Sequence, residues 1–140
     1  VNLYLETSAA LRDVLEGDDG EAVRALLRRA DVVVASRLTI GEVGRVLARM
    51  RVLDAKVAAR VAAREAEFVS DRDLWHLMPI DEAILERCAR PFPVEPVRML
   101  DAVHLATIER VSASVSRLVV LSTDTRVRAN AEALGFELRP

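Results

Sequence analysis

Two short runs without a polar side chain constrain the fold of this sequence more than any other feature. They are Val32–Ala35 and Leu118–Leu121. A strand with one face in water alternates apolar and polar residues, whereas a strand buried on both faces is apolar throughout. The two runs therefore predict strands in the interior of a sheet that is covered on both faces.

Other strand-like and helix-like segments alternate with these runs, with short connections between them. Apolar residues at helical spacing, after Thr, Ser or Asp caps, mark the helices. The predicted strands are Asn2–Leu5, Val32–Ala35, Leu74–Met78, Leu118–Leu121 and Phe136–Leu138. The predicted helices run from a cap at residue 7 or 8 to 17, from 21 to 29, from a Thr39 cap to 50, from an Asp54 cap to 69, from an Asp81 cap to 90, from 98 to 107, and from 124 to 135. This alternation favours a parallel sheet in a single α/β domain over residues 1–140.

Length and composition agree with one folded domain. The 140 residues suffice to bury a substantial core, and 51% hydrophobic with 30% charged residues excludes a disordered or fibrous chain. No apolar run approaches the roughly 20 residues of a membrane span, and no signal peptide is recognisable, so we expect a cytoplasmic protein with no membrane partner. The one cysteine, Cys88, is interpreted as a small core residue.

Several classes of function are disfavoured. Glycine is too sparse for a GxGxxG or phosphate-binding loop, and 4% aromatic residues do not provide a base-stacking platform. A phosphoacceptor signalling domain needs a lysine after a late strand, but the sole lysine, Lys56, lies early and inside a predicted helix. The net charge of −2 argues against a bulk basic nucleic-acid binder. It does not exclude a nuclease with an acidic site, because bound divalent cations would supply local positive charge.

Four acids fall where predicted elements begin or end. Glu6 follows the first strand, and Asp124 follows the fourth. Glu42 and Asp101 lie in the first turns of two helices. Ligands of a parallel sheet bind beyond the carboxyl ends of its strands, so we expect these acids to meet at one edge. Neighbouring carboxylates repel one another, and Mg²⁺ or Mn²⁺ would resolve the repulsion, so the sequence predicts a metal site.

Three of these acids also have simpler interpretations, which the sequence leaves open. Glu42 could complete a capping box with Thr39, and Asp124 could cap a helix. Asp101 could be stabilised by the positive end of the helix dipole alone.

The two histidines are not assigned to the site. His104 lies one turn beyond Asp101 on the same helix face, where it could contact a ligand. We favour instead a buried histidine that is hydrogen-bonded to the backbone. His76, inside a predicted strand, is interpreted as structural.

Four segments, taken together, resemble a known family. They are Tyr4-Leu5-Glu6-Thr7-Ser8-Ala9, Leu38-Thr39-Ile40-Gly41-Glu42-Val43, Leu100-Asp101-Ala102-Val103-His104-Leu105-Ala106 and Val120-Leu121-Ser122-Thr123-Asp124-Thr125-Arg126. Their order and spacing are similar to those of PIN-domain nucleases, and the domain size and Arg98 resemble the VapC toxins of toxin–antitoxin pairs. The resemblance implies an α/β sandwich whose central parallel sheet of about five strands has helices on both faces. It also implies a Mg²⁺- or Mn²⁺-dependent endoribonuclease.

The resemblance further implies roles for particular residues and partners. Metal ligation would centre on Glu6 and Asp101, with Glu42 and Asp124 completing a catalytic acidic cluster. Small hydroxyl residues that support the site would be Ser8 and Ser122. The implied partners are RNA as substrate, a small cognate antitoxin whose tail occupies the active site, and a second copy in a homodimer.

Two points stay open at this stage. The first acid of most family members is aspartate, whereas this chain has Glu6, which would reach the metal directly or through water. Arg98 would contact a phosphate of the substrate or form a structural salt bridge. The alternative function is a catalytically silent PIN domain that acts as a protein- or RNA-binding module.

Overall fold

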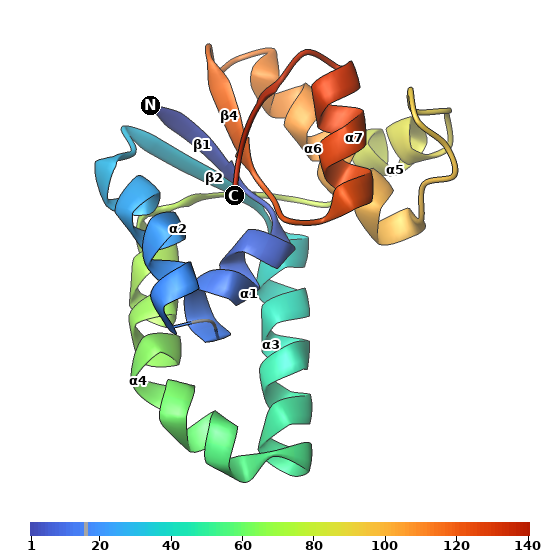
Figure 1. The fold of residues 1–140 in the computed structure, drawn as a ribbon. Helices are drawn as coiled ribbons and strands as arrows, with labels where there is room; N and C mark the ends of the chain where they lie inside the picture. The colour runs from blue at the N-terminus through green and yellow to red at the C-terminus, as the bar shows by residue number, and fades with distance from the viewer. Residues whose placement is uncertain (16) are drawn as a thin grey trace.

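The computed structural model of the chain describes residues 1–15 and 17–140, with residue 19 described by its backbone alone. Strands and helices alternate in the predicted order (Figure 1). The strands are β1 (Asn2–Leu5), β2 (Val32–Ser36), β3 (His76–Met78), β4 (Leu118–Leu121) and β5 (Glu137–Arg139). The helices are α1 (Thr7–Leu15), α2 (Gly17–Arg29), α3 (Arg37–Leu53), α4 (Ala55–Asp71), α5 (Glu82–Cys88), α6 (Met99–Ser112) and α7 (Thr125–Ala133), with a 3₁₀ turn at Arg72–Leu74.

The five strands form one parallel sheet in the order β3-β2-β1-β4-β5. β1 is central, with Tyr4 paired beside Val34 of β2 and Val120 of β4. This architecture confirms the predicted α/β fold with a parallel sheet of five strands. The carboxyl ends of β1, β2 and β4 share one edge, and Glu6 comes directly after β1 at that edge.

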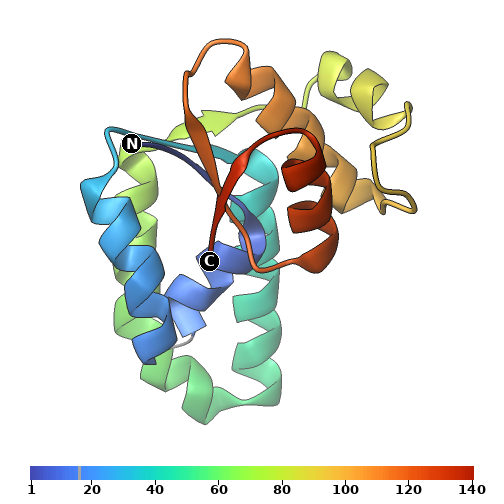
Figure 2. The ribbon, with the colours of Figure 1, turned by 45° about the horizontal axis from the view of Figure 1, so that its top comes forward.

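Helices cover both faces of the sheet (Figure 2). Leu3 and Leu5 of β1 pack into one hydrophobic core with α1, α2, α3 and α4. Tyr4, between them in the sequence, packs into a second core with α5, α6 and α7. Successive strand residues point to opposite faces, so β1 contributes to both cores, and its last three residues are fully buried. The fully apolar runs of β2 and β4 have the same cause.

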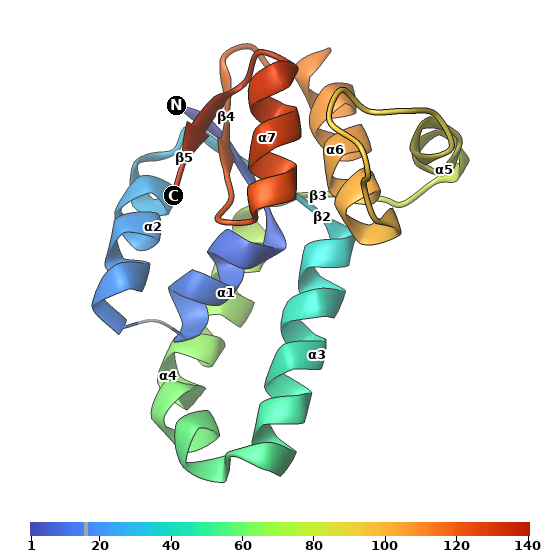
Figure 3. The ribbon, with the colours of Figure 1, turned by 45° about the vertical axis from the view of Figure 1, so that its right-hand side comes forward.

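A buried ion pair joins the helices on one face. Asp13 of α1 is fully buried, and its carboxylate accepts bonds from Arg64 of α4 through Nε at 3.0 Å and Nη2 at 2.5 Å. Arg24 of α2 lies 3.4 Å from the same carboxylate. Beyond this contact, α3 and α4 extend away from the sheet as an antiparallel pair (Figure 3). None of the described helices is long and apolar enough to cross a membrane.

Three predicted helix caps are confirmed, and two are wrong. The first helix, α1, already begins at Thr7, so neither Thr7 nor Ser8 precedes it as a cap. The side chains of Asp54, Asp81 and Asp124 accept bonds from the first-turn amides of α4, α5 and α7. Thr39, however, does not cap α3. That helix begins two residues earlier, because the hydroxyl of Ser36 accepts a bond from the Leu38 amide at 3.1 Å.

The early start of α3 removes the predicted capping box. Thr39 lies inside the first turn, where its hydroxyl donates to the Leu5 carbonyl at 3.4 Å. Glu42 therefore lies in the second turn and has no capping role. Other predicted bounds also shift: α2 begins four residues earlier at Gly17, α6 continues five residues further to Ser112, β3 loses its first two residues, and β5 moves by one residue.

Candidate functional site

Glu6 is held at the end of β1 by hydroxyl groups. Its amide donates to the Leu121 carbonyl at 3.0 Å, which extends the pairing of β1 with β4 by one residue. Its side chain is only 5% exposed. The carboxylate oxygen Oε2 accepts bonds from the Ser8 amide at 3.0 Å, from the Ser8 hydroxyl, and from the Ser122 hydroxyl at 2.8 Å. Three donors to one oxygen fix the orientation of this carboxylate.

The two serines also connect the loop after β4 to the start of α1. Ser8 Oγ accepts bonds from the Thr123 amide at 2.8 Å and the Asp124 amide at 3.2 Å. Ser122 Oγ accepts from the Asp124 amide at 3.1 Å. The Asp124 carboxylate turns toward α7, where Oδ1 accepts from the amides of residues 126 and 127. Asp124 therefore caps α7, as the simpler of its two interpretations predicts.

His104 of α6 lies at the centre of a buried hydrogen-bond network. Its Nε2 is 2.9 Å from Glu42 Oε1 and 3.0 Å from Thr7 Oγ1, and its Nδ1 is 2.9 Å from the Tyr4 hydroxyl. The same Nε2 lies 3.8 Å from Glu6 Oε1. The imidazole is 1% exposed, and all these contacts are to side chains. The prediction that His104 is buried is therefore confirmed, whereas the prediction that it is bonded to the backbone is wrong.

The donors in this network can be assigned from proton supply. Thr7 donates its hydroxyl proton to Glu42 Oε1 at 2.6 Å, so it has none left for the imidazole. The Nε2 atom of His104 must then carry a proton and donate it. Burial, and to a lesser degree the Glu6 carboxylate, raises the pKa of Tyr4 well above its usual range, so the phenol keeps its proton. In a neutral imidazole the Tyr4 hydroxyl therefore donates to Nδ1.

Glu42 is the half-buried end of this network. Burial alone would raise the pKa of the Glu42 carboxyl, but bonds donated by His104 and Thr7 outweigh that effect and hold the pKa below its ordinary value. At neutral pH Glu42 is thus an anion directed toward α6. Neither donor is adjacent to it in sequence, which is why helix-capping rules misassign it.

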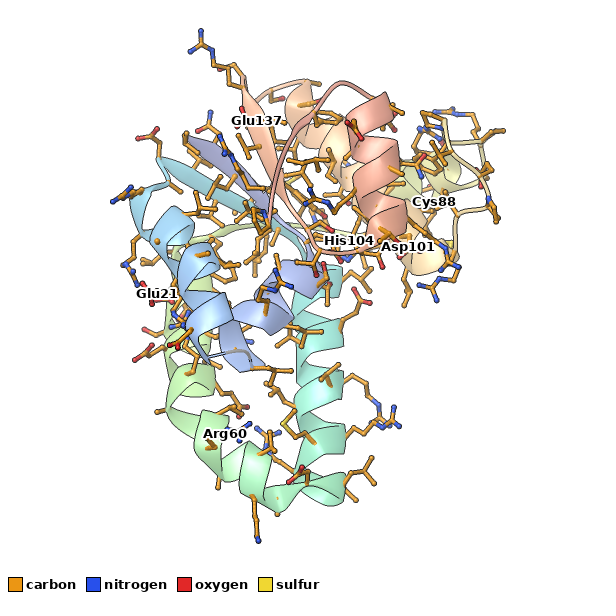
Figure 4. The ribbon with its side chains drawn as sticks, viewed as in Figure 1. Glu21, Arg60, Cys88, Asp101, His104 and Glu137 are labelled. Atoms are coloured by element: carbon orange, nitrogen blue, oxygen red, sulfur yellow. The ribbon has the colours of Figure 1, made fainter. Side chains whose placement is uncertain are left out.

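Asp101 is the third residue of α6 and is 9% exposed. Its Oδ2 accepts a bond from Arg98 Nε at 3.3 Å, so the salt bridge that the sequence left open is present. The Arg98 side chain is 68% exposed, which keeps its outer nitrogens at the surface. Asp101 and His104 lie close together on α6 (Figure 4). Asp101 is thus one helical turn from the residue that contacts Glu42 and Glu6.

Comparison with known proteins identifies the family. The family model described as PIN domain matches residues 3–133 of this chain. The chain belongs to the PIN domain family. Ribonuclease VapC46 of Mycobacterium tuberculosis is 34% identical over 134 residues, which cover 96% of this chain and 93% of that protein. The predicted resemblance to PIN domains is therefore confirmed.

Two solved structures share the fold of this PIN domain. The crystal structure of FitAcB from Neisseria gonorrhoeae superposes with a TM-score of 0.70 at 21% identity, over 99% of this chain and 96% of that one. The structure of FitAB bound to an IR36 DNA fragment gives a TM-score of 0.60 at 18% identity, over 98% and 93% of the two chains. Both comparisons support the five-stranded architecture.

The four acids of this PIN domain differ in how well they could hold a divalent cation. Among the described residues, no three of His, Cys, Asp and Glu are arranged to hold a metal ion together. Glu42 and Asp124 each direct a carboxylate oxygen to other donors. Mg²⁺, however, commonly binds through one or two carboxylates and completes its shell with water. The chemistry of Glu6 and Asp101 fits such a hard cation, without a four-acid cluster.

Sequence reasoning missed three residues of the network: Tyr4, Thr7 and His104. One signal was available, since His104 shares a helix face with Asp101. The other two could not be found, because their roles depend on which face of β1 meets α6. His76 lies exposed on the edge strand β3, away from these residues. Cys88 packs half-buried against the second core, as predicted.

Proposed function

We propose that this PIN domain is an endoribonuclease that hydrolyses RNA phosphodiesters with the help of Mg²⁺ or Mn²⁺. The observation on which the proposal depends is the hydrogen bonding of the Glu6 carboxylate. Its Oε2 is saturated by Ser8 and Ser122, whereas no described donor lies within hydrogen-bond distance of Oε1. Because Oε1 has no donor from the protein, it is the oxygen of this carboxylate that is open to a cation or its bound water. The name of the ribonuclease relative supports RNA as the substrate class.

In this proposal Glu6 and Asp101 hold the cation, which when bound activates water and stabilises negative charge on the phosphate. The chain's own residues orient the groups around it. Ser8 and Ser122 fix Glu6, and the His104 imidazole fixes Glu42 as an anion. Arg98 presents guanidinium nitrogens at the surface beside Asp101, where they can bind a phosphate oxygen of the RNA.

The experiment is an RNA cleavage assay in Mn²⁺ with the intact chain and Asp101→Asn. We expect the variant to lose at least about a hundredfold in cleavage rate, because a ligand carboxylate is removed. The matched control is Glu86→Gln, an exposed acid of α5, which should cleave normally. Equal cleavage by the intact chain and Asp101→Asn would refute the assignment of Asp101. Absence of cleavage by the intact chain would favour the silent binding module.

We further propose that the chain is the toxin of a VapBC-type pair, acting in the cytoplasm with a small antitoxin and forming a homodimer. The relative's name and the shared fold support this proposal. Sedimentation of the purified chain tests the homodimer. To test the antitoxin, the chain is co-expressed with a small reading frame sought beside its gene, and the product of that frame should abolish RNA cleavage in the complex.

A further inference from the structure

Eight arginines of the described chain are paired with acids, whereas the exposed Arg37, Arg45 and Arg49 of α3 are not, and the last two lie on one face of the helix. The paired arginines are Arg24, Arg28, Arg51, Arg64, Arg87, Arg98, Arg110 and Arg139. Arg45 and Arg49 are exposed, and neither has an ion pair or hydrogen bond with a described residue. Their guanidinium groups are therefore available to a ligand.

These two arginines continue the line that begins at Glu42. They follow Glu42 by three and seven residues, spacings that place all three on one face of a helix. At 1.5 Å per residue, they lie about 4.5 Å and about 10 Å further along the axis. Figure 3 shows α3 running from the sheet edge outward, so the row leads away from the candidate site. Glu42 is the only acid of α3.

The helix surface beside this row carries only very small side chains. Gly41, Gly44 and Ala48 are exposed there, and a Cβ added at either glycine would meet nothing within 4 Å. Neither glycine has the positive φ that would require glycine. Glycine is unfavourable inside a helix, and neither the packing nor the backbone geometry of this chain requires it at positions 41 and 44. We call Gly41, Gly44, Arg45, Ala48 and Arg49 the α3 arginine face.

The composition of the α3 arginine face favours a nucleic acid strand over a protein. Protein interfaces are anchored by large apolar or aromatic side chains in a core depleted of charge. None of the five residues of this face is such an anchor, and the exposed apolar residues of α3, Val52 and Leu53, lie at its far end. Guanidinium forks match phosphate oxygens, and a surface of low relief lets a backbone lie close to the helix. We propose that the RNA strand adjoining the cleaved phosphodiester lies along the α3 arginine face, with its phosphates on Arg45 and Arg49. This inference rests on the proposed function for RNA as the ligand.

The test measures binding separately from cleavage. A labelled single-stranded RNA of about 20 nucleotides, longer than a typical single-strand site, is titrated with the full chain in EDTA at several salt concentrations. Arg45→Gln/Arg49→Gln should weaken binding about tenfold and reduce the slope of log affinity against log salt by about 1.4, or 0.7 for each phosphate contact. The matched control is Arg29→Gln/Arg117→Gln, which removes the same charge from two exposed residues. These residues precede β2 and β4, so they lie at the amino ends of the strands, opposite to the candidate site.

A variant that adds a positive charge to the α3 arginine face complements the variants that remove charge. Ala48→Arg adds a third guanidinium to the face and should tighten binding and steepen the slope by about 0.7. Equal weakening by both double variants, or by neither, overturns the proposal. A change in sedimentation of Arg45→Gln/Arg49→Gln with unchanged RNA affinity overturns it too, because the face would then bind protein.

Cleavage in Mn²⁺ distinguishes this proposal from the nuclease assignment. An intact chain that binds RNA through Arg45 and Arg49 but does not cleave it supports the α3 arginine face and contradicts the proposed activity. An intact chain that cleaves RNA, with kcat/KM unchanged in Arg45→Gln/Arg49→Gln, supports the activity and contradicts the α3 arginine face.

Discussion

Nε2 of His104 lies 2.9 Å from Oε1 of Glu42, which joins α6 to α3 across the carboxyl edge of the sheet. The two residues are 62 positions apart in the sequence. Thr7 and Tyr4 complete the network on either side of the imidazole. Glu6 and Glu42 are thus each oriented by donors from other side chains rather than by each other.

Tyr4→Phe should destabilise the fold by about 1–2 kcal/mol. The substitution keeps the buried ring but removes the hydroxyl, which leaves His104 Nδ1 without its partner. Urea denaturation at neutral pH measures the free energy of unfolding. A change below about 0.3 kcal/mol would show that the hydroxyl contributes no net stabilisation.

Stability should fall as the pH drops below the ordinary glutamate range, in part because of Glu42. Its pKa in the folded chain lies below the ordinary value of 4.5, so the unfolded chain binds a proton first. The contribution is complete above that value and is lost as the pH falls through the folded pKa. Glu42→Gln should show a shallower loss of unfolding free energy between neutral and acidic pH than the intact chain. Identical pH profiles would contradict the role of the network, and exposed Glu86→Gln serves as the control.

Asp13→Ala should destabilise the chain by about 3 kcal/mol. The substitution removes the buried carboxylate of α1 that accepts two bonds from Arg64 of α4, which leaves the guanidinium without its partner in the ion pair. Burial alone would lower the pKa of the Arg64 guanidinium, but the bonds that Arg64 donates to Asp13 and Glu67 raise it above the ordinary value. Thermal denaturation checks this prediction, with Asp73→Ala at an exposed position as the control. Equal melting temperatures for the two variants would contradict it.

Gly41→Ala and Gly44→Ala should each stabilise the isolated chain by about 1 kcal/mol. Alanine has the higher helix propensity, and the added methyl group meets no atom of the chain. Chemical denaturation measures the difference. A destabilisation would mean that another surface, such as a second copy, packs closely against α3.

The fold was largely predictable from local patterns. Val32–Ala35 and Leu118–Leu121 indicated interior strands because no other arrangement buries both faces of an apolar run. The caps at Asp54 and Asp81 depended only on amides a few residues away. The start of α3 was missed because Ser36, still in the strand run, satisfies the first turn before Thr39 is reached.

The candidate site was less predictable because its contacts are long-range. Glu6, Ser8 and Ser122 follow or flank strands whose ends meet, so topology alone brought them together. His104 could be placed on the face of Asp101, but its bonds to Tyr4 and Glu42 depend on the depth at which α6 packs on the sheet. Hydrogen-bond partners at such sequence separations leave no local signal.

The most direct test of the central claim is the rate of RNA cleavage in Mn²⁺ by the intact chain and by Glu6→Gln, side by side. Glutamine keeps the size of the side chain and can still accept bonds from Ser8 and Ser122, but it lacks the charge that a cation requires. The account predicts cleavage by the intact chain and a loss of at least about a hundredfold in the variant. Cleavage by Glu6→Gln at the rate of the intact chain would contradict it.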